Sequence, residues 1–306
     1  MATFATGSLT IPKQKLSPWL GKIGNGSCVA SLSAQTPMTF GEGESWTFDI
    51  GEAEYVAEGG QKGQSTVTPT SKPVKPFKFH KTLRFNEEVL WADEDRQMQV
   101  IDEILAEIQP SLSRALDFGV FHEINPTGGA VVVAMNGGLT DTTNLVEYVG
   151  TGAGAQKPYV SLDAADALVL ADGFLPRDIA LSTEYASKFS ALRGTNSEQK
   201  LYPNFVLGTE VSELDGHRAS VSNTVSGTGI TGFVDTKVLG FVGDFSAIRW
   251  GVQKSIGLEV IKYGDPDGGG DLKRNNQVAF RAEVVYGWGV ADLNAFAKVT
   301  DAVTEI

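Results

Sequence analysis

Two glycine-rich stretches are the parts of the sequence whose spacing comes closest to a ligand or reaction site. The sequence GTGAGAQKP, at residues 150–158, resembles a phosphate-binding loop only in its glycines, because Lys157 is followed by Pro158 instead of Ser or Thr. The sequence DPDGGGD, at residues 265–271, has the alternating aspartates of a calcium loop, but Asn276 stands where the last acidic ligand is expected. Both stretches are therefore interpreted as loops.

The histidines and the single cysteine form no recognisable constellation. His80, His122 and His217 are far apart in the sequence, and none is paired with a nucleophile in the manner of a catalytic triad. Cys28 has no charged neighbour in sequence to activate its thiol. One cysteine cannot form an internal disulfide, and with three scattered histidines it cannot build a zinc cluster. The sequence thus predicts no catalytic residue, no metal site and no cofactor.

The composition describes a folded and acidic protein. Of the 306 residues, 42% are hydrophobic, and the formal net charge is −12. This hydrophobic share is too high for a disordered chain, and an acidic chain lacks the basic surface of a nucleic-acid clamp. No apolar run approaches the ~20 residues that a membrane-spanning helix needs. Since no secretory signal is visible either, we expect a soluble protein made in a reducing cytoplasm, with no membrane partner.

A long hairpin is predicted after an amino-terminal arm. The first 45 residues hold no pattern long enough for a core element and are interpreted as an extended arm. The alternation of Trp46, Phe48 and Ile50 predicts a strand, and the sequence FKFHKTLRF, at residues 77–85, predicts the returning strand. A lone hairpin is marginal in water, so we expect this one to lie on another surface.

Charge is divided sharply between this hairpin and the segment that follows it. Residues 59–86 contain six basic residues and no acid, whereas residues 87–107 contain eight acids and one base. Two solvated faces would explain this pattern; alternatively, the hairpin of one copy lies on an acidic surface of the next. The candidate contact residues are basic Lys62, Lys72, Lys75, Lys78, Lys81 and Arg84, and acidic Glu87, Glu88, Glu94, Asp95, Asp102 and Glu103.

The strongest helical pattern runs over residues 93–121, where apolar residues recur at spacings of three and four. Pro110 interrupts this pattern, and because proline removes a backbone donor, we expect a bent helix. Further helices are predicted from Ser161 and Thr183, and short strands follow without a regular βαβ repeat. The predicted fold class is therefore α+β.

The order of these parts resembles the major capsid proteins of tailed bacteriophages. The sequence EAEYVAEGGQKGQSTVTPTSKPVKPFKFHKTLRFNEEVL looks like that family's extended loop, return strand and entry to a long spine helix. Further along, DIALSTEYASKFSALRG resembles a strand leading to a short helix, and VGDFSAIRWGVQKSIGLEV resembles the family's Gly-Asp-Phe strand. The sequence NQVAFRAEVVYGWGVADLNAFAKVT resembles the closing strands of that family. The resemblance covers about residues 45–300 and rests on the order of these stretches.

The resemblance implies the fold of that family and its parts. The implied parts are an N-terminal arm at 1–45, an extended loop at 46–86, a peripheral domain at 87–174 and 276–306 with the spine helix at 93–121, and an axial domain at 175–275. The implied function is that of a major capsid protein, which assembles into pentamers and hexamers of an icosahedral head that encloses double-stranded DNA.

The resemblance also implies partners and a location. The expected partners are other copies of the chain, a separate scaffolding protein, a portal and a decoration protein, with non-specific contact to packaged DNA. The expected location is the virion, after assembly in the cytoplasm of a bacterial host. Two alternatives stay open: an encapsulin-type nanocompartment that encloses a cargo enzyme, and an enzyme whose site is invisible in the sequence. A covalent Lys–Asn crosslink, known in some relatives, is not expected.

Overall fold

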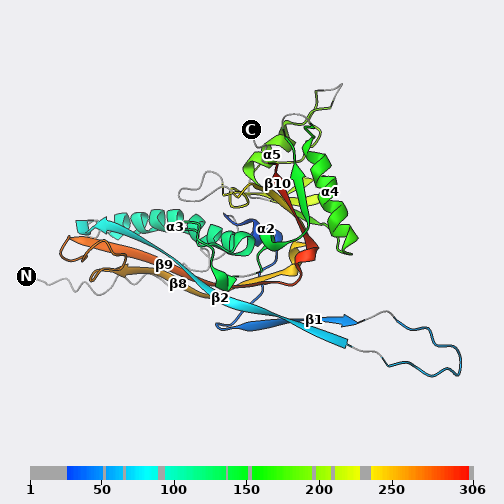
Figure 1. Cartoon of the computed structure of the whole chain (residues 1–306). Helices are drawn as coiled ribbons and strands as arrows, with labels where there is room; N and C mark the ends of the chain where they lie inside the picture. Colours follow the sequence, from blue (N-terminus) through cyan, green and yellow to red (C-terminus); the bar gives the residue numbers. More distant parts are fainter. Residues whose placement is uncertain are drawn as a thin grey trace, which may run out of the picture.

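The computed structural model describes residues 26–50, 53–64, 67–88, 94–135, 137–150, 154–194, 198–207, 211–227 and 236–302. Two β-sheets and their helices make up the protein, with a hairpin projecting from one side (Figure 1). This arrangement confirms the predicted α+β class. Among the described residues, no helix is long and apolar enough to cross a bilayer.

The first sheet is a long antiparallel one. Its order is β1-β2-β9-β8, formed by β1 (Gly43–Ile50), β2 (Val67–Asn86), β9 (Gln277–Val290) and β8 (Ile248–Ile261). The sequences AIRWGVQ and GLEVIKYG each have the pattern of a short strand, whereas the structure has one continuous strand, β8, in their place. Register shifts in its pairing with β9 explain the difference, because they interrupt the alternation without ending the strand.

Helix α3 (Glu94–His122) lies along this sheet (Figure 1). It stays helical through Pro110, which confirms one continuous helix rather than two. Burial of Ile108 and Leu112, on either side of the proline, stabilises the helix where one backbone hydrogen bond is missing.

The second sheet has six strands in the order β3-β10-β7-β4-β6-β5. These strands are β3 (Leu145–Tyr148), β10 (Phe296–Asp301), β7 (Val238–Gly243), β4 (Asp178–Leu181), β6 (His217–Val221) and β5 (Ser212–Leu214). Helices α4 (Pro158–Ala171) and α5 (Thr183–Ala191) complete this unit. Helix α4 begins three residues before the predicted Ser161, because Pro158 is well suited to the first turn. Short 3-10 helices span Val133–Met135, Leu139–Asp141, Phe245–Ala247 and Leu293–Ala295.

The sheets divide the chain differently from the predicted domains. The predicted peripheral domain, 87–174 and 276–306, includes α4 and β10, but both pack in the six-stranded unit. The predicted axial domain, 175–275, includes β8, which pairs with β9 in the long sheet. The two units therefore exchange strands along the chain, which a linear division of the sequence does not reveal.

The predicted arm contains a core element. Helix α2 (Cys28–Leu32) is buried, and Cys28, Val29 and Leu32 belong to the main hydrophobic core. The expectation of an extended arm through residue 45 is therefore wrong for this segment. A helix of five residues is too short to show a periodic apolar pattern, so it cannot be predicted from apolar spacing.

A buried carboxylate fixes α2 in place. Asp117, on α3, accepts hydrogen bonds from the Cys28 N–H at 2.9 Å and the Val29 N–H at 3.1 Å. It also accepts from the hydroxyl of Ser27, the N-cap of α2, and from that of Thr224 at 2.6 Å, in the turn after β6. Burial raises the pKa of Asp117, and the hydrogen bonds from both hydroxyls lower it in part. One side chain thus joins α2, α3 and the six-stranded unit.

We predict that Asp117→Asn lowers the free energy of unfolding by about 3 kcal/mol, because each buried donor left without an acceptor costs ~1–3 kcal/mol. Urea unfolding of the unassembled protein measures this loss. The matched control is Asp163→Asn, at an exposed position of α4, which should change stability by no more than ~0.5 kcal/mol. Equal losses for the two variants would show that the buried hydrogen bonds contribute little.

The ring of His217 lies buried between β6 and α4. Its Nε2 is 3.1 Å from the Asp166 carboxylate, and its Nδ1 is 3.3 Å from the Leu214 carbonyl. Since both neighbours are acceptors, the geometry favours the doubly protonated ring. Burial lowers the pKa of His217, but Asp166 and the Leu214 carbonyl outweigh it, and the net shift is upward.

We therefore predict a pH-dependent stability of the six-stranded unit. A raised pKa in the folded state gives a stabilisation that is fully present below the ordinary histidine value of 6.5 and is lost as the pH rises through the folded value. Thermal unfolding across this range should show the loss in the parent protein and not in His217→Gln. His80→Gln, at an exposed position, is the control and should retain it. An unchanged pH profile in His217→Gln would contradict the assignment.

Candidate interaction surface

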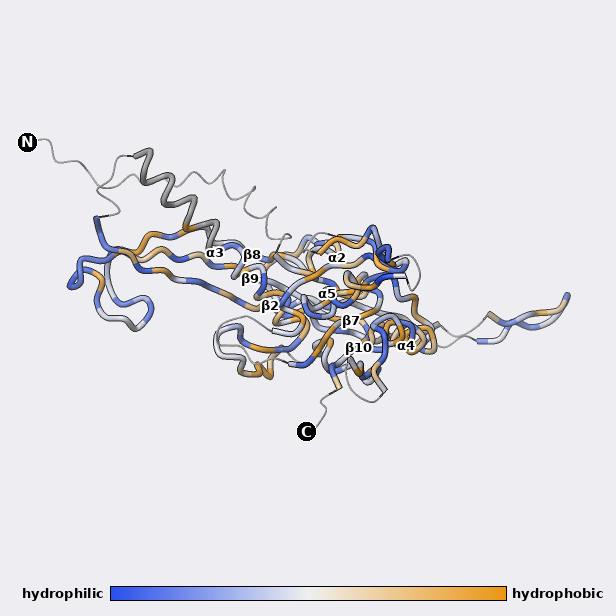
Figure 2. The backbone as a smooth tube through the Cα atoms, turned by 90° about the horizontal axis from the view of Figure 1, so that it is seen from above, coloured by the Kyte–Doolittle hydropathy of each residue, from blue (hydrophilic) through white to orange (hydrophobic). Residues whose placement is uncertain are grey.

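Strand β1 and the first part of β2 form a hairpin at the edge of the long sheet, and this hairpin projects beyond the rest of the protein (Figures 1 and 2). Its ladder runs from the pair of Gly43 and Val74 to the pair of Ile50 and Val67. At ~3.3 Å per residue, this ladder is about 25 Å long. The tip, residues 53–64, is almost wholly exposed. The structure confirms a hairpin here, but residues 67–74 form its returning strand, and the predicted returning strand at 77–85 pairs with β9 instead.

The hairpin exposes large apolar side chains to solvent, which is unfavourable unless a partner covers them. Trp46 is 55% exposed and Tyr55 is 89% exposed. A two-stranded ribbon buries little surface of its own, and exposed apolar groups on such a ribbon are typical of a binding surface. Pro69 and Pro73 remove backbone donors from β2, which limits the addition of further strands. The ribbon is therefore suited to docking through side chains.

Only part of the predicted extended loop projects away from the long sheet. Residues 67–74 of β2 pair with β1, whereas residues 75–86 pair with β9 inside the long sheet. The predicted range of 46–86 therefore includes a segment, residues 75–86, that pairs within the long sheet. Of the candidate basic residues, the free hairpin carries Lys62 and Lys72, and the part paired with β9 carries Lys75, Lys78, Lys81 and Arg84.

The lysines differ in their contacts within the chain. Lys62, Lys72 and Lys81 are exposed. The Lys78 Nζ atom lies 2.6 Å from the Glu283 carboxylate on β9, so its charge has a partner in the same copy.

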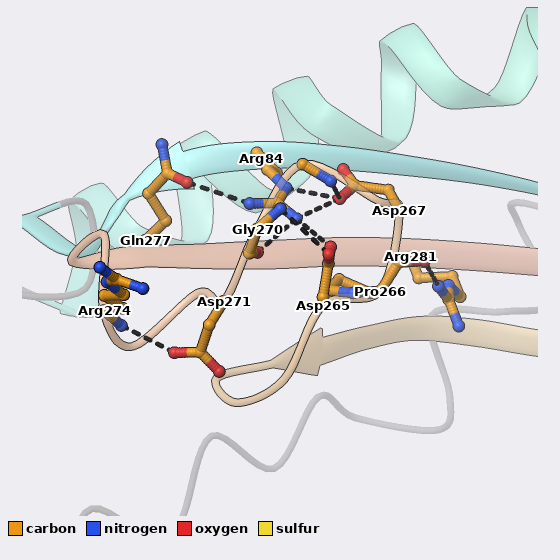
Figure 3. Close-up of polar contacts among 10 residues, drawn as sticks. Arg84, Asp265, Pro266, Asp267, Gly270, Asp271, Arg274, Gln277 and Arg281 are labelled. Carbon is orange, nitrogen blue, oxygen red and sulfur yellow. Dashed lines mark hydrogen bonds and ion pairs between the residues drawn. The ribbon is translucent and has the colours of Figure 1, made fainter.

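Arg84 is held by a loop of its own chain (Figure 3). Its Nε donates to Asp267 at 2.6 Å, and one terminal nitrogen donates to Asp265 at 2.7 Å and to the Gly270 carbonyl at 2.9 Å. The other terminal nitrogen donates to Gln277 at 3.2 Å. The hydrogen bond that Arg84 donates to Asp267 raises the pKa of Arg84 and lowers the pKa of Asp267.

These contacts explain the sequence DPDGGGD, which resembles a calcium loop. Its aspartates bind a guanidinium, and Gly268 and Gly270 have positive φ angles of 79° and 97° that let the loop wrap around Arg84. A Cβ atom at Gly269 would lie 2.9 Å from the Arg84 Cζ atom, so a side chain does not fit there. Among the described residues, no group of three or more His, Cys, Asp or Glu could hold a metal ion. Contact of Arg84 with a neighbouring copy stays a prediction, and most of its donors are already engaged.

The structure describes the side chains of only two of the six predicted acidic contact residues. Glu87 pairs with Lys273 of the same chain at 3.0 Å, and Glu88 is exposed. The remaining acidic candidates belong to α3, but their side chains lie outside the described ones: Glu94, Asp95, Asp102 and Glu103. An acidic docking face on α3 therefore stays a prediction.

A groove of about 250 Å³ lies at the root of the hairpin. Lys72 and Lys75 line it together with Phe77, Met135 and Trp288, which come from three separate segments of the chain. The described residues that line the groove include no histidine and no cysteine.

The model of a phage capsid protein family matches residues 69–299, which is most of the chain. The chain belongs to this family. A solved structure from Mycobacterium phage Ogopogo is 40% identical to it, with 91% of this chain and 92% of that chain covered and a TM-score of 0.75. A structure from Gordonia phage Cozz is 28% identical, with 90% and 87% covered and a TM-score of 0.72. A search of curated proteins gave no match.

More distant structures share the fold of this capsid protein. The capsid of a native GTA particle is 13% identical, with 92% of this chain and 91% of that chain covered and a TM-score of 0.57. The protein is thus a phage major capsid protein of the virion shell, and its copies assemble into that shell. These matches confirm the resemblance found in the sequence and do not favour the encapsulin alternative. Membership of a structural protein family also argues against an enzyme.

The groove of the capsid protein could not be found in the sequence. Its aromatic residues, Phe77 on β2 and Trp288 on β9, belong to alternating aromatic patterns that also include Phe79 and Tyr286. Opposed aromatic patterns of this kind indicate a paired face. The strand register, which brings Phe77 opposite Tyr286, is visible only in the structure.

We predict that Arg84→Ala frees the loop at residues 264–276. Amide hydrogen exchange at Gly269 and Gly270 should become faster, because the carboxylates that brace these residues lose their partner. Arg84→Lys should rescue exchange only in part, since a lysine cannot bind several acceptors in one plane. Lys81→Ala, at a neighbouring exposed position, is the control. Slow exchange in Arg84→Ala would show that the loop is ordered without the arginine.

Proposed function

We propose that this capsid protein forms pentamers and hexamers of an icosahedral head enclosing double-stranded DNA, with the hairpin of each copy lying on a neighbour. The observation that carries the proposal is the projecting hairpin, with Trp46 and Tyr55 exposed. Burying such apolar surface lowers the free energy of the system. Other copies of the chain are the partners that could bury it in a shell. Many modest contacts of one type then sum to a stable shell.

The two structural units are suited to different places in such a shell. The long sheet with α3 carries the hairpin at its edge, and we assign it to the peripheral part of a capsomer. We assign the six-stranded unit, with α4 and α5, to the axial part around the capsomer centre. Glycines at the loops between elements support small adjustments between pentamers and hexamers.

The charge of the chain suits a DNA container. At −12, the protein as a whole does not have the basic character that would trap DNA, because affinity for phosphates rises with each neutralised contact. The DNA contact in this proposal is weak and independent of sequence. A scaffolding protein, a portal and a decoration protein complete the proposed assembly, which takes place in the cytoplasm of the host.

The test is electron microscopy of shells assembled from purified protein, alone or with its scaffold. The parent protein should form closed shells, and a triple variant with Lys62, Lys72 and Lys75 changed to Glu should form few, because the hairpin and its root then repel acidic surface on the neighbouring copy. High salt should weaken assembly of the parent protein for the same reason.

A control triple variant has the same net charge, with Lys157, Lys200 and Lys254 changed to Glu at exposed positions away from the hairpin. It should assemble like the parent protein. Assembly that is indifferent to both the hairpin variant and salt would show that the hairpin lysines are merely solvated. A parent protein that stays monomeric under all conditions would contradict the proposed function itself.

A further inference from the structure

The groove at the hairpin root has the shape and chemistry to receive one aromatic side chain. Its volume of about 250 Å³ is below the ~300–1,000 Å³ typical of sites for whole small molecules. Its aromatic lining is Trp288, only 5% exposed, with the Phe77 ring centroid 4.3 Å away. Further apolar contact comes from Met135 and Leu293. Aromatic rings of this kind favour a further ring in offset or edge-on contact.

Basic side chains line the same groove. Lys72 is exposed and Lys75 is partly exposed, and both belong to β2 at the point where its pairing changes from β1 to β9. A segment that fits the groove should therefore carry an aromatic residue flanked by carboxylates.

The tip of the hairpin has this composition. Tyr55 is 89% exposed, Glu54 precedes it and Glu58 follows it. The tip is braced from within, because the Gly63 N–H donates to Glu54 at 3.2 Å and the Gly60 N–H donates to the Ala57 carbonyl at 2.8 Å. Tyr55 is thus presented on an ordered loop, which lowers the entropy cost of binding.

The tip cannot reach the groove of its own chain. The β1–β2 ladder separates the two by about 25 Å at ~3.3 Å per residue. Figures 1 and 2 both show the tip at the far end of the hairpin from the body. The occupant must therefore be the tip of another copy, and self-assembly of this protein into shells supplies such copies.

We propose that Tyr55 of one copy inserts into the root groove of the next copy, with Glu54 and Glu58 facing Lys72 and Lys75. The tip and the groove are different surfaces of one chain, so the contact is head-to-tail and closes into a ring when the rotation between copies allows it. This inference rests on the proposed function and names the receptor that the hairpin uses.

The experiment is disulfide trapping in assembled shells. Tyr55→Cys is combined with Leu293→Cys at the groove, and the native Cys28 is fully buried and does not interfere. A disulfide requires Cα atoms about 4.4–6.8 Å apart. Oxidised shells should therefore give a ladder of linked subunits on non-reducing gels. Tyr55→Cys with Leu201→Cys, at an exposed site of the six-stranded unit, is the control and should give none.

Charge exchange gives a second measurement that does not need the cysteines. Changing Glu54 and Glu58 to Lys should impair shell assembly, and changing Lys72 and Lys75 to Glu in the same chain should restore it. Tyr55→Ala should raise the protein concentration needed for assembly by about tenfold or more, as loss of an aromatic anchor does, and Tyr55→Phe should not.

The outcomes separate the two proposals. Shells that form without a ladder overturn the tip-in-groove contact and leave the proposed function standing, as does a charge exchange without rescue. If the double-cysteine protein fails to assemble, the charge exchange decides in its place. Failure of the parent protein to form shells overturns the proposed function.

Discussion

The continuity of β2 is the constraint on which the rest of the structure depends. This strand of 20 residues pairs with β1 over its first part and with β9 over the remainder. Because the hydrogen-bonded ladder passes from one partner to the other without a break, the hairpin has a direction fixed by the long sheet. The groove lies where the partner changes, so the projection and its proposed receptor are positioned by the same strand.

A second constraint joins the two units of the subunit. Asp117 accepts hydrogen bonds from α2 and from Thr224 beyond β6, in a site without water exposure. A buried carboxylate tolerates such a site only when donors surround it, and this makes the geometry of the junction specific. At the far end of the long sheet, Arg84 is likewise surrounded by groups of opposite character. Its hydrogen bonds to two aspartates hold a glycine-rich loop against β2.

Much of the fold could be predicted from the sequence, and the reasons for the exceptions are physical. Helix α3, helix α5 and strand β1 follow from apolar spacing, which depends only on neighbouring residues. Strand partners do not, so the predicted division of the chain separates β8 from its partner β9 and β10 from its partner β7. The same limit applies to the candidate site: the lysines were visible as a charge pattern, but the aspartates that bind Arg84 lie some 180 residues away in sequence. Helix α2 cannot be predicted in this way, because five residues are too few to show the apolar periodicity of a helix.

The place of β10 in its sheet has a consequence for the newly made chain. This strand follows every other described helix and strand in the sequence, yet it lies between β3 and β7. During translation, the six-stranded sheet therefore has a gap in its interior until β10 leaves the ribosome. Domains generally fold as units once their whole chain has emerged. A subunit still attached to the ribosome thus lacks a finished six-stranded unit, and this delays its entry into a shell until synthesis has passed β10.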